Sequence, residues 1–256
     1  MRREFAPDSI SEIIIEDINS SVFIKPGNRL AVTCRDIKRG FYDIAAEAGV
    51  LHVKYCFNKK SIFADMFRRK CIVLEIPACW HGILRASTTN ARIIMEAGTD
   101  DVYLSTTNSR IVVTDTAAGA LKAETSNGRI CIDRFSSRST ELRTSNAGIK
   151  LNDVNAAENI IISTSNGSIS AENISAPVFD AATGNGAIRV KAVDSGNISL
   201  VTYNASVTGV LPGSMADYMI TSSTSNGKNS LPSASNGKKK LNVETSNAKI
   251  DILFEN

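Results

Sequence analysis

Apolar and polar residues alternate along most of the chain, and the pattern recurs about every 19 residues around a Thr-x-Asn motif. The steps between successive motif asparagines are 18, 19, 19, 20, 19, 19, 22 and 21 residues. Apolar side chains mostly stand four residues before the asparagine and three and five after it. This period of two predicts a half-buried strand on each side of the motif. The motif asparagines are Asn90, Asn108, Asn127, Asn146, Asn166, Asn185, Asn204, Asn226 and Asn247.

The alternation changes phase at the motif itself, usually at Asn-Gly or Asn-Ala, which predicts a corner between the two strands. Asn and Gly tolerate a positive φ, so we expect left-handed backbone at this corner. A unit of about 19 residues cannot bury its own apolar face and must stack on its neighbours. We therefore predict an all-β fold, a single-stranded right-handed parallel β-helix (β-solenoid) whose coils, or rungs, pair with the equivalent strand one turn later.

The motif threonine and asparagine share the parity of the apolar positions, so both are expected to point inward. Stacked asparagine amides would then hydrogen-bond from rung to rung and satisfy groups that are costly to bury alone. This assigns the nine asparagines a structural role. With rungs about 4.8 Å apart, eight steps make a rod of roughly 38 Å.

The N-terminal third contains a divergent copy of the template, in which Asp17 takes the threonine position and Asn19 the asparagine position. The 71 residues from there to Asn90 are long enough for three or four further turns, with strand-like runs at 30–34, 50–57 and 71–76. A solenoid needs closed ends, so we expect residues 1–83 to form divergent first rungs and an N-terminal cap. They would be continuous with a regular rod over residues 84–256, interrupted by a loop at 229–240.

The repeated Thr-Ser-Asn-Gly-x-Ile, together with the strand end Leu74-Glu75-Ile76-Pro77, resembles the bacterial putative-adhesin family of β-solenoid proteins, a family of formally unknown function. The resemblance covers about residues 10–254. It implies a right-handed β-helix, a role in the cell envelope and no assigned catalytic residues.

Composition and charge narrow the function classes. The aromatic share of 6% favours a core of small and β-branched side chains. Residues 1–83 carry 13 Lys and Arg against 10 Asp and Glu, whereas residues 84–256 carry 16 of each, so the net charge of +3 comes from the N-terminal third. This charge distribution lacks the dense basic surface of a nucleic-acid-binding protein, and nucleic acid is therefore not expected as a partner.

Export and membrane signals are also weak in the sequence. No apolar stretch after Met1 is long enough for a signal peptide, and none approaches the length of a transmembrane helix. Five cysteines without a Cys-x-x-Cys pair favour reduced, mostly buried thiols. These features predict a cytoplasmic protein, whereas the family resemblance implies the cell envelope.

Candidate catalytic residues are lacking. No column of equivalent positions stacks two acids on neighbouring rungs, and acids six residues after the motif asparagine, such as Asp133 and Glu172, are about two rungs apart. His52 and His81 lie outside the repeats, and His81 with Trp80 is expected at the junction of cap and rod. We predict no catalytic residue, no cofactor and no metal site. Between neighbouring rungs, Lys122 is expected over Glu141, and Glu124 over Arg143.

Two basic groups are candidates for contact with an anion or a partner. Three successive rungs carry an arginine two residues after the motif asparagine, and like charges at rung spacing repel unless an anion lies between them. The other group lies in residues 59–70, a candidate for contact with a membrane surface or an acidic partner, in which residues 61–70 read as a short amphipathic helix or exposed loop. The residues are Arg92, Arg110 and Arg129 in the first group, and Lys59, Lys60, Arg68, Arg69 and Lys70 in the second.

Three functions remain open from the sequence. The first is a non-catalytic scaffold or adhesin-like protein that presents a repetitive surface to a glycan or protein partner. The second is a bactofilin-like cytoskeletal element that assembles with copies of itself. The third is a polysaccharide lyase or hydrolase, which the census of acids disfavours.

Overall fold

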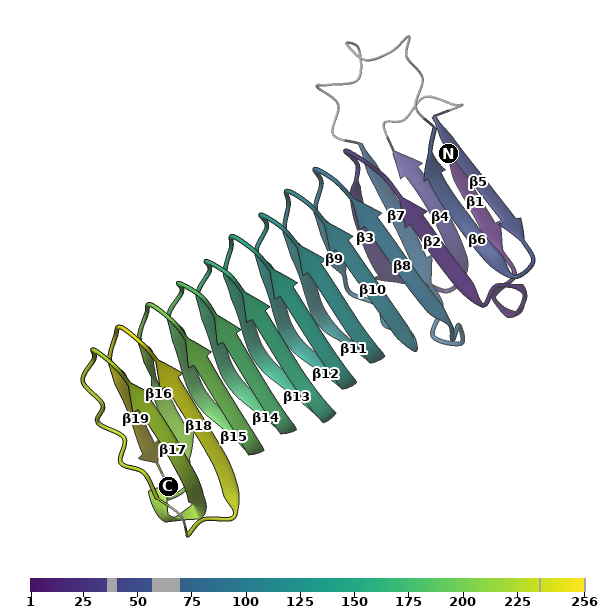
Figure 1. Cartoon of the computed structure of the whole chain (residues 1–256). Helices are drawn as coiled ribbons and strands as arrows, with labels where there is room; N and C mark the ends of the chain where they lie inside the picture. The colour runs from purple at the N-terminus through teal and green to yellow at the C-terminus, as the bar shows by residue number, and fades with distance from the viewer. Residues whose placement is uncertain (36–40, 57–69, 235, 256) are drawn as a thin grey trace.

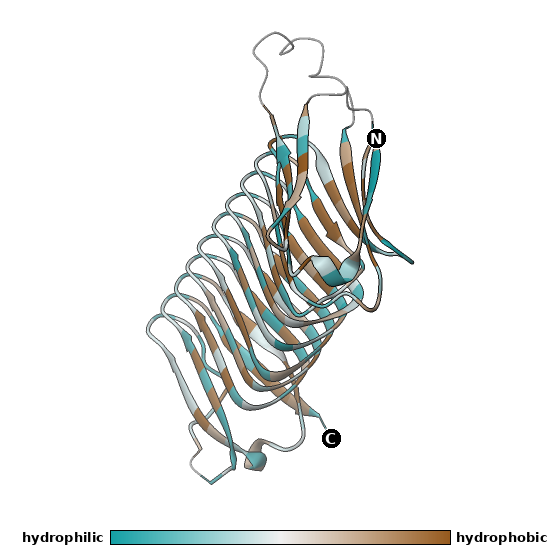
Figure 2. Ribbon diagram, turned by 90° about the vertical axis from the view of Figure 1, so that its right-hand side faces the viewer, coloured by the Kyte–Doolittle hydropathy of each residue, from teal (hydrophilic) through white to brown (hydrophobic). Residues whose placement is uncertain are grey.

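The computed structural model describes residues 1–35, 41–56, 70–234 and 236–255. The nineteen strands of this part of the chain belong to one hydrogen-bonded sheet, wound into an elongated solenoid (Figure 1). Hydrophobic and hydrophilic positions alternate along the strands (Figure 2), and the inward side chains form one continuous core. Phe135 and Phe179 are the largest buried side chains of the central rungs, whose other core residues are mainly Ile, Val, Leu and Ala. The predicted parallel β-solenoid is confirmed.

The central rungs stack in register because each begins and ends at the same motif positions. A strand begins at the apolar residue three positions after the asparagine and runs to the next motif threonine, so that Ile111 pairs with Ile130 and Thr125 with Thr144. The strands predicted on both sides of the motif are therefore present. These rungs contain β8 (Ile83–Thr88), β9 (Ile93–Met95), β10 (Asp101–Thr106), β11 (Ile111–Thr125), β12 (Ile130–Thr144), β13 (Ile149–Thr164), β14 (Ile169–Thr183) and β15 (Ile188–Thr202).

Each long strand contains one left-handed bend, a residue with positive φ that lies seven residues after the motif asparagine. The five residues are Asp115, Arg134, Asp153, Asn173 and Ala192, with φ values of 48–54°. The prediction of left-handed backbone at the Asn-Gly corner is wrong, because no motif residue in the described chain has a positive φ. Asn and Asp adopt the left-handed region more readily than most residues, which suits three of these five positions.

The N-terminal end is built out of sequence order. β2 pairs in parallel with both β6 and β8, and β3 pairs with both β7 and β9. The rung of Asn19 therefore lies directly against the rung of Asn90, and strands β4 to β7, which come between them in the sequence, form the outer cap. The expectation that three or four turns separate these two rungs is wrong. The strands are β1 (Arg2–Phe5), β2 (Glu12–Glu16), β3 (Ser21–Pro26), β4 (Leu30–Arg35), β5 (Tyr42–Glu47), β6 (Val50–Tyr55) and β7 (Cys71–Ile76).

Antiparallel pairs close the outside of this cap. β4 pairs in antiparallel with both β1 and β7, and β5 pairs in antiparallel with β6. The strand-like runs at 30–34 and 71–76 and most of that at 50–57 are present, whereas β5 was missed. Phe57 lies outside the described residues. Antiparallel strands break the parallel register, so the cap does not offer a copy of the rod's own edge to another molecule.

The C-terminal end repeats the same arrangement. β18 (Lys239–Thr245) pairs with both β15 and β17 (Tyr218–Thr224), and β19 (Ile250–Glu255) pairs with β16 (Val207–Pro212). The last rung in the sequence is thus inserted between its two predecessors, as Figure 1 shows for β18 between β15 and β17. Simple sequential stacking is therefore wrong at both ends. The described residues also contain two short 3-10 helices, η1 (Pro7–Ser9) and η3 (Met215–Asp217).

The segment predicted as a loop between the last two rungs lies partly along the outermost strand. Ile220 of β17 exchanges both backbone hydrogen bonds with Ala234, at 2.7 and 3.1 Å. This antiparallel bridge occupies part of the outer edge of β17. A bridged edge offers fewer unpaired backbone groups to another strand.

Candidate functional site

The motif threonines point into the solenoid and hold each corner closed. The hydroxyl of Thr144 donates to the carbonyl of Gly128 in the preceding rung at 3.1 Å, and Thr183 makes the same bond to Gly167 at 3.0 Å. Equivalent bonds recur along the rod, and most of these threonines are buried. The predicted inward orientation of threonine is confirmed. Each hydroxyl satisfies a carbonyl that the corner leaves without a strand partner.

Glycine after the asparagine permits close stacking of rungs. A Cβ on Gly167 would lie 1.7 Å from the carbonyl oxygen of Ala147. In the glycine-containing rungs the glycine N–H also donates to the motif threonine, as Gly167 does to Thr164 at 3.1 Å. Glycine is thus used here for close approach of backbones, which is its other common role besides positive φ.

The motif asparagines form a continuous chain of side-chain hydrogen bonds on the surface of the rod. Asn146 Nδ2 donates to Asn127 Oδ1 at 2.7 Å, and Asn166 donates to Asn146 at 2.9 Å. Nine such bonds join Asn19 to Asn226 through the other eight motif asparagines, and we call this array the asparagine ladder. All ten side chains are exposed.

The expectation that the asparagines point inward is therefore wrong. The strand ends at the motif threonine, and the chain turns before it reaches the asparagine, so the parity of the strand no longer applies there. The bonds between amides remain possible because the corners of neighbouring rungs still stack in register.

Every bond of the ladder points in the same direction. Nδ2 of each asparagine donates toward the N-terminal end of the rod, from Asn226 through Asn247 and Asn204 to Asn19. The two ends therefore differ chemically. Asn19 keeps both N–H groups of its Nδ2, for which no acceptor is seen among the described residues, and Asn226 keeps a side-chain oxygen.

The three candidate arginines lie beside this ladder on successive rungs. Ile93 N donates to the carbonyl of Arg110 at 3.1 Å, and Ile111 N to that of Arg129 at 3.0 Å, which sets the stacking. Arg92 is half-buried over the ring of Phe23, 5.3 Å from its centroid. Within the described ranges, none of the three forms an ion pair with an acidic side chain.

The second basic group is only partly described. Lys59, Lys60, Arg68 and Arg69 lie outside the described residues, as does most of the predicted amphipathic segment. Lys70 is described, and its Nζ lies 5.7 Å from the ring centroids of Phe41 and Tyr55. This places Lys70 at the same end of the rod as Asn19, since Ser21 N donates to the Lys70 carbonyl at 3.1 Å.

A surface hollow of about 690 Å³ lies where the ladder ends at Asn19. Its lining includes the terminal asparagine of the ladder, two of the candidate basic residues and two serines from neighbouring rungs. The lining residues that carry these groups are Asn19, Ser21, Lys70, Arg92 and Ser109, with Phe23 as an apolar wall. We call it the Asn19 hollow.

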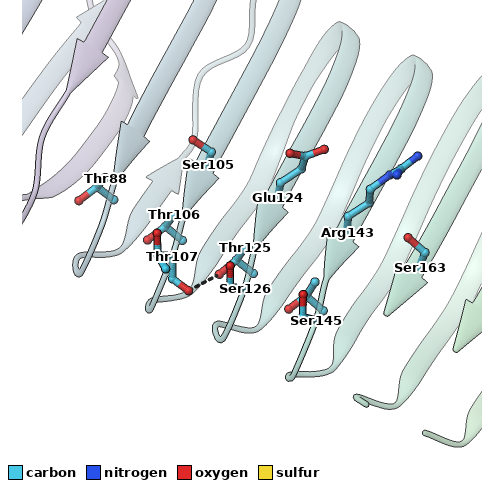
Figure 3. Close-up of a pocket in the computed structure, with 11 residues that line it drawn as sticks. Thr88, Ser105, Thr106, Thr107, Glu124, Thr125, Ser126, Arg143, Ser145 and Ser163 are labelled. Atoms are coloured by element: carbon cyan, nitrogen blue, oxygen red, sulfur yellow. Dashed lines mark hydrogen bonds between the residues drawn. The ribbon is translucent and has the colours of Figure 1, made fainter. Parts of the chain in front are cut away.

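A second hollow of about 510 Å³ follows the strand ends just before the ladder, across five successive rungs (Figure 3). Hydroxyl groups dominate its lining, including Thr107, Ser126 and Ser145, and Glu124 and Arg143 supply its charges. We call it the hydroxyl groove. The sequence analysis did not predict this groove, because it forms only where the strand ends of successive rungs stack.

The predicted ion pairs are partly present. Lys122 lies 3.8 Å from Glu141 on the next rung, as predicted. Glu124 and Arg143 are aligned in register, but each pairs along its own strand, Glu124 with Lys122 at 3.1 Å and Arg143 with Glu141 at 2.6 Å. Such exposed pairs contribute little to stability.

The left-handed bends carry a polar network that sequence reasoning missed. Arg134 donates to Asp115 on the preceding rung at 2.5 Å and to Asp133, its neighbour in sequence. Asn152 Nδ2 lies 2.7 Å from Asp133 and 2.9 Å from Asp153. The hydrogen bond from Arg134 lowers the pKa of Asp115 to about 2. The signal was available, because Asp or Asn recurs seven residues after the motif asparagine.

The carboxylates of this network do not form a cluster of metal ligands. Within the described ranges, no group of three His, Cys, Asp or Glu side chains is arranged to hold a metal ion. His81 lies 3.2 Å from Asp100 at the exposed surface, and Trp80 is buried with its indole N–H donating to the Ile10 carbonyl. In that same part of the chain, no helix has the length and apolar character needed to cross a bilayer.

The cysteines differ from expectation in one respect. All five are free thiols, but only Cys34 is buried, whereas Cys56 and Cys79 are exposed. Burial raises the pKa of Cys34 to about 11, so that this thiol stays protonated at neutral pH. The prediction of mostly buried thiols is wrong.

Comparison with known proteins gives the fold a family context. The family model described as Toastrack DUF4097 matches residues 10–253. A crystal structure of a putative adhesin from Parabacteroides merdae is similar over 99% of this chain and 95% of that one, with 13% identity and a TM-score of 0.59. A putative adhesin from Bacteroides fragilis is similar over 99% and 96%, with 12% identity and a TM-score of 0.55. Among curated proteins, none matches this sequence. At these identities the similarity establishes the fold alone.

Proposed function

The chain belongs to the Toastrack DUF4097 family, and from that premise we propose that it is a non-catalytic binding scaffold of the cell envelope that lays its polar face along an extended glycan. The description of two structural neighbours as putative adhesins supports an adhesin-like role and an envelope location over a cytoplasmic one. The family context itself names no ligand. The choice of a glycan therefore depends on the surface chemistry of the rod.

The asparagine ladder is the observation that carries this proposal. Each inner asparagine uses one N–H and accepts one hydrogen bond within the ladder, which leaves one N–H and one lone pair for solvent or a ligand. These groups recur at the rung spacing of about 4.8 Å, close to the length of one sugar unit in an extended polysaccharide. A polymer lying along the rod can therefore meet the same donor and acceptor at each step.

The hydroxyl groove adds a second row of polar groups beside the ladder. Thr107, Ser126 and Ser145 each immediately precede a ladder asparagine, so groove and ladder advance together from rung to rung. Hydroxyls both donate and accept, which suits the hydroxyl groups of sugars. Each polar contact of this kind is weak, and the affinity for the polymer comes from many such contacts made at once, as in multivalent binding.

The proposal is tested by filling the groove. Tyr203 already occupies the position before a ladder asparagine in its own rung and is exposed, so tyrosine is sterically compatible with this column. The double substitution Ser126→Tyr and Ser145→Tyr should weaken retention on peptidoglycan and on glycan arrays by about tenfold or more. Ser136→Tyr, on the exposed segment after the left-handed bend, is the matched control and should leave retention unchanged.

Two results would contradict the proposal. Absence of any glycan retention by the full chain would remove the proposed partner class. Equal retention by the groove variant and the control would mean that the ligand lies on another face. Capture of a defined protein partner that the groove variant loses would point instead to a protein ligand.

A further inference from the structure

We propose that the Asn19 hollow is an anion-binding site for a carboxylate or phosphate group. The inference deepens the proposed function, because an anion site at one end of a glycan-binding face selects acidic glycans. The selection of an acidic glycan rests on the proposed function, whereas the binding of a single carboxylate or phosphate group does not.

The uniform direction of the ladder makes this end of the rod electropositive. Nine side-chain amides donate in sequence toward Asn19, so their dipoles add in the manner of the peptide dipoles of a helix. Hydrogen bonds in such a chain also polarise one another. The Nδ2 hydrogens of Asn19 form the positive end of the series, and they border the hollow.

Arg92, Lys70 and two serines line the same space. Arg92 is half-buried on Phe23, where less water screens its guanidinium, and no acid pairs with it in the described structure. Lys70 borders the hollow from the cap, and Ser21 and Ser109 border it from the adjoining rungs. A guanidinium and neutral donors that border one hollow suit the oxygens of a carboxylate or phosphate.

The acid of the Asn19 rung forms no ion pair with Arg92. Asp17 is buried, and its oxygens accept hydrogen bonds from the backbone N–H groups of Asn19 and Ser20 and from the Tyr42 hydroxyl. Its carboxylate is thus committed to the corner of its own rung. Lys25, on the same strand as Phe23, is compensated by Glu96 at 3.9 Å.

The arginine column extends the site along the rod. Arg110 and Arg129 follow Arg92 on the next two rungs, at the rung spacing of about 4.8 Å. Three neighbouring cations without carboxylate partners in the described chain repel one another, and a ligand with repeated negative charges relieves that repulsion. A single anion occupies the hollow, and an acidic polymer continues along the column.

The test uses a variant that keeps the ladder. Asn19→Asp still accepts the hydrogen bond from Asn90 Nδ2, but it replaces the free N–H groups with a negative charge in the hollow. Arg92→Gln removes the half-buried cation. Arg189→Gln is the matched control, since Arg189 is exposed several rungs away and forms no ion pair among the described residues.

Inorganic phosphate is the first probe, measured by calorimetry and by amide chemical shifts at low ionic strength on the full chain. We expect saturable binding that is about tenfold or more weaker in Asn19→Asp and in Arg92→Gln and unchanged in Arg189→Gln. Absence of saturable phosphate binding, or equal binding by Asn19→Asp and the native chain, would overturn the site.

Oligogalacturonate and its uncharged methyl ester are the second pair of probes. Tighter binding of the acid than of the ester, lost in Asn19→Asp, supports an acidic glycan as the source of the anion. If phosphate binds in an Asn19-dependent way and neither oligosaccharide binds, the Asn19 hollow is a site for free phosphate. The proposed glycan-binding function is then contradicted, while the anion site is supported.

Discussion

Nδ2 of Asn90 donates to Oδ1 of Asn19 at 2.9 Å, although 71 residues separate the two asparagines in the sequence. This contact joins the first rung of the chain to a rung formed much later, and it is the last link of the asparagine ladder. Because all the other links have the same direction, the ladder has a donor end at Asn19 and an acceptor end at Asn226.

The direction of the ladder predicts that the same substitution destabilises the fold less at Asn19 than at Asn226. Asn19→Asp keeps the acceptor that Asn90 uses, so the free energy of unfolding should change by less than about 0.5 kcal/mol. Asn226→Asp loses the bond to Asn247 and sets two acceptors against each other, which should cost about 1 kcal/mol. Urea unfolding at neutral pH measures both. A larger cost at Asn19 than at Asn226 would mean that the ladder has the opposite direction.

Thr144 should matter more for stability than Asn146, two residues later. Thr144→Val leaves the buried carbonyl of Gly128 without its donor and should lower the free energy of unfolding by about 1–3 kcal/mol. Asn146→Leu removes two exposed bonds whose groups water can replace, and should cost less than about 1 kcal/mol. Thermal unfolding of both variants provides the comparison, and an equal or greater loss in Asn146→Leu would contradict the assignment of inward and outward positions.

The left-handed bend at Asp115 should respond to acid. Its pKa is lowered from 3.8 to about 2 by the hydrogen bond from Arg134. A lowered pKa in the folded state stabilises the fold above the unfolded value, and this contribution disappears as pH falls from about 4 toward 2. An NMR titration should give a midpoint near 2 in the native chain and a higher one in Arg134→Gln. The stability difference between the two proteins should also shrink over that pH range; a constant difference would exclude this linkage.

Removal of residues 239–256 should also disorder β17, which remains in the shortened chain. β18 lies between β15 and β17, so its loss leaves β17 without its parallel partner. We expect the backbone amides of β17 to lose hydrogen-exchange protection in a chain of residues 1–238. A chain of residues 1–212, which ends with β16, is the control and should keep protection in β14 (Ile169–Thr183). Persistent protection of β17 in the chain of residues 1–238 would show that β17 can pair with β15 directly.

The sequence predicts the regular part of the fold well because the period of two and the motif spacing act in every rung. The threonine positions, the parallel register and the strand bounds in the rod all follow from that repetition. The asparagine orientation does not, because parity applies only while the strand continues, and the strand ends at the threonine. The left-handed bends lie inside apparently uninterrupted strands, where a residue such as Asp115 is read as one more polar position.

The order of rungs at the two ends of the rod could not be predicted from the sequence pattern, for a different reason. Rungs with similar motifs are interchangeable as neighbours, so nothing in the Asn226 and Asn247 motifs states which one contacts Asn204. Which rung contacts Asn204 depends on connecting segments such as residues 213–217. The repeat pattern does not indicate how the length of such a segment determines the order of rungs. The Asn19 hollow depends on that same order, because Asn19 and Arg92 become neighbours only when strands β4 to β7 form the outer cap.

The inserted terminal rung also determines when the rod can be completed during protein synthesis. A ribosome releases β17 before β18, yet β17 acquires its parallel partner only once β18 has emerged and occupied the space beside β15. Rungs from β8 to β15 can assemble one after another as the chain lengthens, whereas the C-terminal end waits for the final residues. A nascent chain that stalls within these last residues would carry an open edge, and full translation is what closes it.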